Sequence, residues 1–181
     1  MDRMSPSEGE GAGSIPAEGT RTIDKGMENQ IREIEEFLEK ANKYGYANPE
    51  ASKSPSLRPA SEDYHYEEGD YVYHDTYFGG ASFIGEEIIY KRNIPIWGLN
   101  YYGYITSTKK SEKEVYDFLR QALMVEYTGI PPVRGPRQLA SGDWEYRNSI
   151  DGDISNLTGT EEILNQGEVV YKAVYNGGLI S

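Results

Sequence analysis

The chain of 181 residues contains no cysteine and two histidines. Without cysteine there can be no disulfide, thiolate metal site, iron–sulfur cluster or cysteine nucleophile, and a reducing compartment is the natural setting. His65 and His74 have no partner at metal-ligand spacing, which favours solvated or hydrogen-bonded histidines over catalytic ones. We therefore predict no metal site and no cofactor.

Long hydrophobic runs are also missing from the sequence. No run of eighteen or more apolar residues occurs, and the segment from Met1 to Glu8 has neither a basic start nor an apolar stretch after it. Membrane spans and standard secretion signals need such runs. We expect no membrane association and a cytoplasmic location.

Basic residues are few, with 18 Lys and Arg against 30 Asp and Glu and a formal net charge of -12. This charge repels a phosphate backbone wherever no local basic patch overrides it, and the Lys and Arg residues are scattered. We therefore do not expect the chain to bind nucleic acid directly.

The composition favours tyrosine among the aromatic residues, with 16 Tyr, 4 Phe and 2 Trp. Tyrosine suits strands whose rings pack while their hydroxyls reach water or a ligand. A tyrosine-rich sheet face is the simplest interpretation.

The chain divides into a tail and one domain. Residues 1–26 are rich in Gly, Ser, Pro, Glu and Thr, which predicts a disordered tail, and residues 27–181 are long enough for a single α+β domain with one core. Apolar residues at three- and four-residue spacings predict a helix from Met27 to about Tyr44. A second helix should begin at Ser111, which forms a capping box with Glu114.

Strands should fill much of the rest. The segments 71–77, 86–90 and 94–102 are separated by short turns, which predicts an antiparallel meander. Residues 47–62 are rich in proline and small polar residues and are typical of an extended loop, serving either as a lid or as a spacer.

The second half of the sequence repeats a pattern of the first half. We interpret this as a duplication, with repeats at about 27–107 and 111–181, although any two meanders share glycines at turns and aromatics in strands. The predicted fold is an antiparallel sheet of about six strands from a duplicated helix-plus-three-strand-meander unit, with two main helices on one face. The matched positions are Tyr73 with Tyr146, Asp75 with Asn148, Gly79 with Gly152, Gly85 with Gly159, Glu87 with Glu161, Ile89 with Ile163, Trp97 with Tyr171, Tyr101 with Tyr175 and Gly103 with Gly177.

Five motifs carry a family resemblance that covers about residues 30–180. They are Tyr73-x-Asp75-x-Tyr77-x-Gly79, Phe83-x-Gly85-Glu86-Glu87, Pro95-x-Trp97-x-x-Asn100-Tyr101-Tyr102-Gly103, Arg134-Gly135-Pro136, and Tyr171 through Gly177-Gly178. With these motifs the chain resembles an uncharacterised prokaryotic domain family found alone or behind an Xre-type helix-turn-helix domain. The resemblance implies a sensing or regulatory role, and it implies no known activity. No helix pair of the DNA-binding type is evident in this sequence.

Polar and aromatic residues of the first meander, together with Arg134, form the candidate ligand-binding site. Strand alternation places Tyr73, Asp75 and Tyr77 on one face, and if Trp97 faces the core, Asn100 and Tyr102 point the other way. Asp75 either orients a ligand or pairs with Arg134 or with backbone donors, and Arg134 either clamps a ligand carboxylate or phosphate or pairs with Asp75 or Glu86. The full candidate set is Tyr73, Asp75, Tyr77, Glu86, Trp97, Asn100, Tyr102 and Arg134.

A calcium-loop interpretation of the segment from Asp151 to Glu162 is rejected. Oxygen ligands stand at suitable positions, but Asn156 replaces the glycine that such loops need and no helices flank the segment. We expect a hairpin connection there.

Three functions remain open from the sequence. The first is a non-enzymatic binding or regulatory module, in which a tyrosine-lined groove gated by the 47–62 loop takes a small polar or cationic ligand. The second is a hydrolase or isomerase that uses Asp75 or Glu86 as base and Arg134 as electrostatic stabiliser, although no catalytic residue can be assigned. The third is an acidic domain that docks a basic protein partner.

Overall fold

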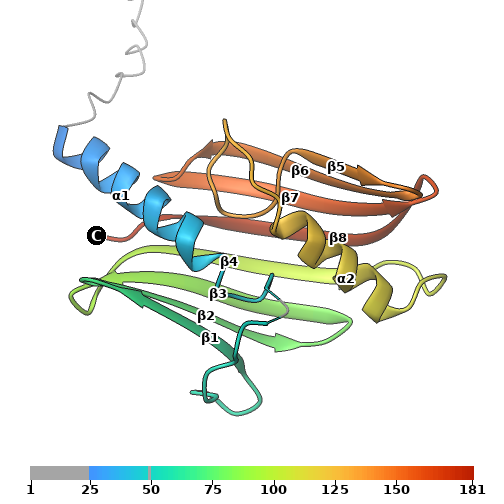
Figure 1. Ribbon diagram of the computed structural model, residues 1–181, viewed down its shortest axis with the longest axis horizontal. Coiled ribbons are helices and arrows are strands. Elements are labelled where there is room, and N and C mark those ends of the chain that lie inside the picture. Colours follow the sequence, from blue (N-terminus) through green and yellow to red (C-terminus); the bar gives the residue numbers. More distant parts are fainter. Residues whose placement is uncertain (1–24, 49) are drawn as a thin grey trace, which may run out of the picture.

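A computed structural model describes residues 25–48 and 50–181 of the chain. Within these ranges it contains two helices and eight strands, and the strands form one antiparallel sheet in the order β1-β2-β3-β4-β8-β7-β6-β5 (Figure 1). The predicted disordered tail lies almost entirely outside the described residues. The elements are α1 (Lys25–Ala41), β1 (Glu62–Glu68), β2 (Tyr71–Gly79), β3 (Ser82–Lys91), β4 (Ile94–Ile105), α2 (Glu112–Leu123), β5 (Gln138–Ser141), β6 (Trp144–Asp153), β7 (Asn156–Asn165) and β8 (Glu168–Leu179).

The expected sheet of about six strands from two helix-plus-three-strand repeats is wrong. The described chain forms eight strands, and the two that the sequence did not reveal, β1 and β5, are the edges of the sheet. Edge strands face water along one side and carry polar residues that hide the hydrophobic alternation. β1 has the sequence EDYHYEE, and β5 has four residues.

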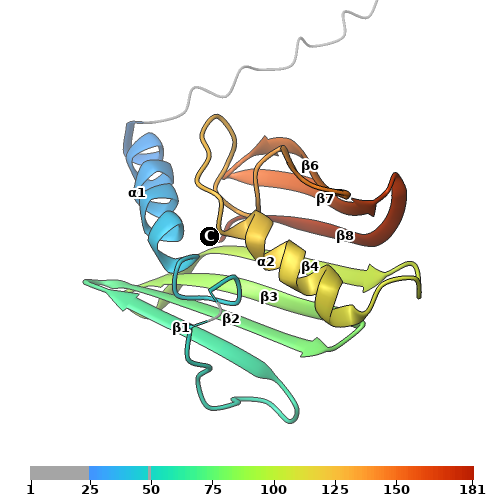
Figure 2. The ribbon, with the colours of Figure 1, turned by 45° about the vertical axis from the view of Figure 1, so that its right-hand side comes forward.

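The two helices lie on the same face of the sheet (Figure 2). In α1 the residues Ile34, Phe37, Leu38 and Ala41 are buried, as expected for an amphipathic helix whose apolar stripe faces a core. α2 begins at the predicted capping box, in which the Ser111 hydroxyl accepts from the Glu114 N–H and the Glu114 carboxylate accepts from the Ser111 N–H.

Each helix covers its own cluster of core residues, and the cluster under α1 contains residues from both halves of the sheet. The core under α1 includes Ile89, Trp97 and Leu99, and the core under α2 includes Tyr146 and Ile163. Trp97 is fully buried, and its indole Nε1–H donates to the Ile154 carbonyl oxygen at 2.9 Å. The strands β4 and β8 pair at the centre of the sheet, so one continuous sheet joins the two halves.

Candidate functional site

A cavity of about 180 Å³ lies on the helix-covered face of the sheet, between the end of α1, α2 and strands β2 to β4. Its walls combine aromatic rings with charged groups. Its described lining is Asn42, Gly45, Tyr46, Ala47, Tyr73, Asp75, Tyr77, Gly79, Gly80, Phe83, Glu87, Tyr101, Glu112, Tyr116, Leu119, Arg120, Leu123, Val133 and Arg134.

Asp75 accepts a hydrogen bond from a tyrosine of another strand. The Tyr101 hydroxyl of β4 donates to Asp75 Oδ1 of β2 at 2.6 Å, and both side chains are buried. The Tyr101 ring crosses β3 at Gly85, where an added Cβ would lie 2.5 Å from Tyr101 Cζ and 2.6 Å from the Thr76 carbonyl oxygen. Glycine at position 85 is therefore what allows the Tyr101 hydroxyl to reach the carboxylate.

Glu87 lies beside Asp75 on the neighbouring strand. The register of β2 and β3 places the two residues directly opposite each other, and Glu87 is 5 % exposed. Its Oε2 atom has no hydrogen-bond partner among the described residues. Two buried carboxyl groups thus meet in one place, and the described residues leave one of their oxygens unsatisfied.

Arg134 enters the cavity from the segment between α2 and β5. Its Nη2 lies 2.8 Å from Glu161 Oε2, whereas its Nη1 lies 3.9 Å from Glu87 Oε1. Glu161 also accepts from the Tyr146 hydroxyl, and the Arg134 guanidinium lies 5.4 Å from the centre of the Tyr101 ring. The close ion pair of Arg134 is therefore with Glu161, which leaves Glu87 with a weaker, longer contact.

The backbone around Arg134 is fixed by three side chains. The Tyr127 hydroxyl donates to the Arg134 carbonyl oxygen, and Asn148 Nδ2 donates to the Gly135 carbonyl oxygen at 2.8 Å. The Gly135 N–H in turn donates to the Tyr146 hydroxyl at 3.1 Å. These contacts fix the backbone at Arg134, and Glu161 engages the guanidinium, whose Nε–H has no partner among the described residues.

Burial changes the acidity of the paired carboxyl groups. It raises the pKa of Asp75 to about 6, even though the Tyr101 hydrogen bond and Arg134 act in the opposite direction. For Glu87, burial and then the neighbouring Asp75 carboxylate raise the pKa to about 8. Two carboxyl groups with separated pKa values in one cavity are an arrangement found at functional sites.

Aromatic rings form the remaining walls. Tyr46 and Tyr77 meet edge to face at 5.8 Å, and the Arg120 guanidinium lies 4.6 Å from the centre of the Tyr46 ring. The Tyr116 hydroxyl donates to the Gly80 carbonyl oxygen at 2.8 Å, which ties α2 to the turn between β2 and β3. Such walls offer ring faces to an apolar or cationic ligand.

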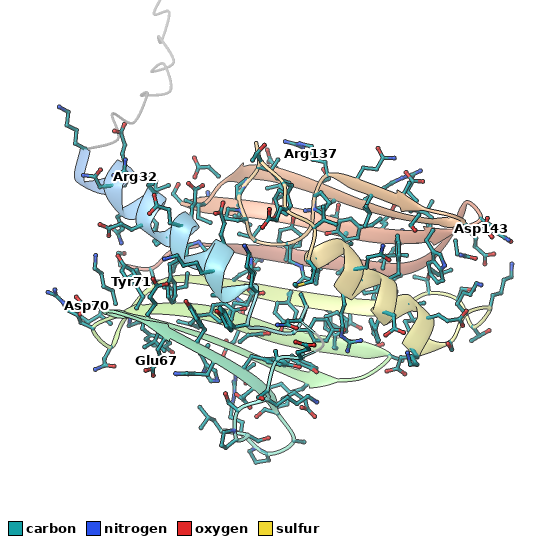
Figure 3. The ribbon with its side chains drawn as sticks, in the orientation of Figure 1. Arg32, Glu67, Asp70, Tyr71, Arg137 and Asp143 are labelled. Atoms are coloured by element: carbon teal, nitrogen blue, oxygen red, sulfur yellow. The ribbon has the colours of Figure 1, made fainter. Side chains whose placement is uncertain are left out.

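The structure brings four of the eight predicted site residues into this cavity, namely Tyr73, Asp75, Tyr77 and Arg134. Trp97 is fully buried in the core under α1, outside the lining. Glu86, Asn100 and Tyr102 alternate with inward-facing neighbours and point to the opposite face of the sheet, where Glu86 pairs with Arg58 at 2.8 Å. Arg137, three residues after Arg134, is exposed at the periphery of the molecule (Figure 3).

Glu87, Tyr101 and Glu161 were not among the predicted site residues. In the sequence, the match of Glu87 with Glu161 in the second half of the chain favours a structural role for Glu87 at a turn. The apolar residue Ile89 could have identified Glu87 in the sequence. If Ile89 faces the core, strand alternation places Glu87 on the same inner face and Glu86 on the outer face.

The 47–62 loop contributes Ala47 to the described lining of the cavity. Further along this loop, the Leu57 N–H donates to Asp63 Oδ2 at 3.4 Å, and Arg58 reaches Glu86 on the outer face. Most of the described loop therefore packs at the β1 edge of the sheet. The segment from Asp151 to Glu162 forms the predicted hairpin, in which Asp153 pairs with Asn156.

Within residues 25–48 and 50–181, no group of three or more His, Cys, Asp or Glu side chains has the geometry to hold a metal ion. None of the helices described there is both long and apolar enough to cross a membrane.

The family model for a domain of unknown function, DUF5680, matches residues 75–180, and the chain belongs to this family. The expected membership of an uncharacterised domain family is thereby confirmed. Neither the curated proteins nor the solved structures include a significant match to the chain.

Proposed function

We propose that this domain is a non-enzymatic binding module for a small organic cation, held in the cavity by Asp75 and Glu87. The observation that carries the proposal is the pair of buried carboxyl groups whose close cationic neighbour, Arg134, is already engaged by Glu161. Burying an ionised carboxylate is costly unless a cation or hydrogen-bond donors compensate it. A bound cation would supply this compensation.

The shape and lining of the cavity support an organic cation in particular. Tyr73, Tyr77 and Tyr101 border the carboxyl groups, and aromatic faces attract ammonium groups and pack against the attached carbon skeleton. The described residues lack the donor set for a metal ion. Among cations, the site therefore favours a compact ammonium compound.

A thermal-shift experiment with the full chain tests the proposal, using benzylammonium as the probe and benzyl alcohol as its uncharged control. A ligand that binds the native state raises the melting temperature by mass action. We expect a shift with the ammonium compound and none with the alcohol. The shift should disappear in Glu87→Gln and persist in Glu86→Gln, because Glu86 lies on the opposite face of the sheet.

The proposal fails if benzylammonium and benzyl alcohol act alike on the wild-type protein. It also fails if Glu86→Gln abolishes the shift while Glu87→Gln retains it.

A second candidate, acid–base catalysis by a hydrolase or isomerase, is favoured by the raised pKa values of Asp75 and Glu87 beside Arg134. In this alternative one carboxyl group donates a proton while the other accepts one, and Arg134 stabilises developing negative charge. Nitrophenyl esters and glycosides provide the test for the hydrolase form. Turnover that Asp75→Asn abolishes and Glu86→Gln retains would favour the enzyme over the binding module.

A regulatory role would follow naturally from ligand binding. The resemblance to domains found behind Xre-type helix-turn-helix domains supports a module that reports the presence of its ligand to a neighbouring domain. The prokaryotic setting and this association stay predictions for the present chain.

A further inference from the structure

We infer that the ligand of this cavity is an ammonium ion with at least one N–H, of the primary or secondary amine class, and that its binding releases a proton that Asp75 and Glu87 share in the free protein. The inference rests on the proposed function. It adds two features to that function, the N–H groups of the ligand and the coupling of binding to proton release.

The shared proton follows from the strand register. Directly opposite residues of neighbouring antiparallel strands have Cβ atoms about 4.5–5.5 Å apart, and like charges there repel each other. Asp75 and Glu87 occupy such positions, and both are buried, so little water screens them. Two interacting carboxyl groups of this kind lose their protons in two separate steps. Burial together with this repulsion raises the pKa of Glu87 to about 8, so one proton stays on the pair at neutral pH.

The described residues do not satisfy Glu87 when its carboxyl group is ionised. Its Oε2 atom then has no donor, and the Tyr73 hydroxyl and the Arg134 charge lower the pKa of the group without offsetting burial and the Asp75 charge. An N–H from a ligand ammonium would supply a hydrogen bond and a positive charge together. A quaternary ammonium would supply the charge alone, which is why we infer the N–H class.

The other charged and titratable groups around the pair come from every element that borders the cavity. Burial raises the pKa values of Tyr73 and Tyr101, so these hydroxyls stay protonated near neutral pH, and the Arg134 guanidinium stays charged. The charged and titratable groups that line the cavity, act on the pair or contact Glu161 are Tyr46, Tyr64, Tyr73, Tyr77, Tyr101, Glu112, Tyr116, Arg120, Arg134, Tyr146, Glu161 and Tyr171, with Asp63 and His74 on the opposite face of β1 and β2.

The proton release gives the binding a defined pH dependence. Below the pKa of about 8 that burial gives Glu87, the ligand must displace a proton, so affinity rises with pH and levels off above that value. For one released proton, the dissociation constant should fall by up to about tenfold per pH unit between pH 6 and pH 8.

The test is calorimetric titration of the full chain with benzylammonium and with benzyltrimethylammonium at pH 6, 7 and 8, in phosphate because it contains no amine. A pH-stat titration at pH 7 measures the released protons directly. We expect about one proton per bound benzylammonium, the stated rise in affinity with pH, and a dissociation constant at least about tenfold higher for the trimethyl compound. In Glu87→Gln, benzylammonium should bind more weakly and release no proton.

Circular dichroism checks that Glu87→Gln folds, and Asp75→Asn serves in its place if it does not. Equal binding of the two ammonium compounds without proton release would overturn the inference and leave the proposed function intact. Absence of binding by both compounds at every pH would overturn the proposed function and the inference with it.

Discussion

Glu87 differs from the other buried carboxylates of the chain in the partners that its oxygens have. Burial raises the pKa of Asp63, but hydrogen bonds from Ser61, Thr76 and His74 outweigh burial and hold the pKa below its ordinary value. Glu161 has Arg134 and the Tyr146 hydroxyl. In Glu87, Oε2 has no partner among the described residues, and the Tyr73 hydroxyl and Arg134 do not offset the burial of the carboxyl group. Stability alone does not account for such a residue.

Replacing Glu87 should therefore stabilise the protein at high pH. A carboxyl group whose folded pKa lies near 8, above its ordinary value of 4.5, stabilises the fold fully below pH 4.5, and this contribution is lost as the pH rises toward 8. Glu87→Gln has no such loss. Relative to the wild type, the free energy of unfolding of the variant should therefore increase by up to about 1.4 kcal/mol per pH unit across this window. Urea unfolding at pH 5, 7 and 8.5 measures this difference.

Asp63→Asn is the matched control for this experiment. Because Asp63 is fully hydrogen-bonded and its pKa is lowered, its replacement should destabilise the protein at neutral pH. A free energy difference between Glu87→Gln and wild type that is constant from pH 5 to pH 8.5 would show that Glu87 does not titrate in this range.

At the scale of the elements, the ring of Tyr101 from β4 packs across the neighbouring strand β3 at Gly85. The same arrangement occurs in the other half of the sheet, where the Tyr175 ring crosses β7 at Gly159 and its hydroxyl donates to Asn148 Oδ1 at 2.6 Å. The tyrosine hydroxyl therefore donates to a neutral amide, Asn148, in the second half of the sheet and to a carboxylate, Asp75, in the half that contains the cavity. Both halves of the sheet thus share the packing of a tyrosine ring across a glycine, and only the half with the cavity adds the carboxyl group of Asp75.

Gly85→Ala should displace Tyr101 and break its hydrogen bond to Asp75. Because the new Cβ would also meet the Thr76 carbonyl oxygen at 2.6 Å, the backbone cannot easily yield, and we expect a loss of about 1–3 kcal/mol in unfolding free energy. Urea unfolding measures this loss. Gly45→Ala is the control, because its nearest neighbour is the Ala41 carbonyl oxygen at 3.8 Å, and an equal loss there would contradict the interpretation.

Sequence patterns predicted the central elements better than the edges. The spacing of Ile34, Phe37 and Leu38 and the capping box at Ser111 identified both described helices, and alternation identified the strands with apolar inner faces. The edge strands β1 and β5 escaped because their residues are polar or few. Alternation also assigned Tyr73, Asp75 and Tyr77 to one face, whereas the Arg134–Glu161 pair depends on tertiary packing that spacing does not encode.

For the whole molecule, the folded unit is larger than the segment that defines the family. The family model begins at residue 75, within β2, and so leaves out α1 and β1. Yet Ile34 and Leu38 of α1 and Tyr73 of β2 are buried in the core under α1. The core and the cavity both require residues that precede the matched segment.

A fragment of residues 75–180 should therefore fail to fold cooperatively, whereas residues 25–181 should unfold at the same temperature as the full chain. Removing α1 would expose the apolar residues that it covers, including Ile89 and Leu99. Calorimetric scans of the two fragments and the full chain measure this difference. A cooperative transition in the 75–180 fragment would contradict the account of the core.

The central claim is that Asp75 and Glu87 together form a site for an organic ammonium ion, and calorimetric titration of benzylammonium into the full chain at pH 8 tests it most directly. The account predicts saturable binding at one site in the wild type and in Glu86→Gln, and none in an Asp75→Asn, Glu87→Gln double variant that circular dichroism shows to be folded. Equal binding by the wild type and the double variant would contradict it.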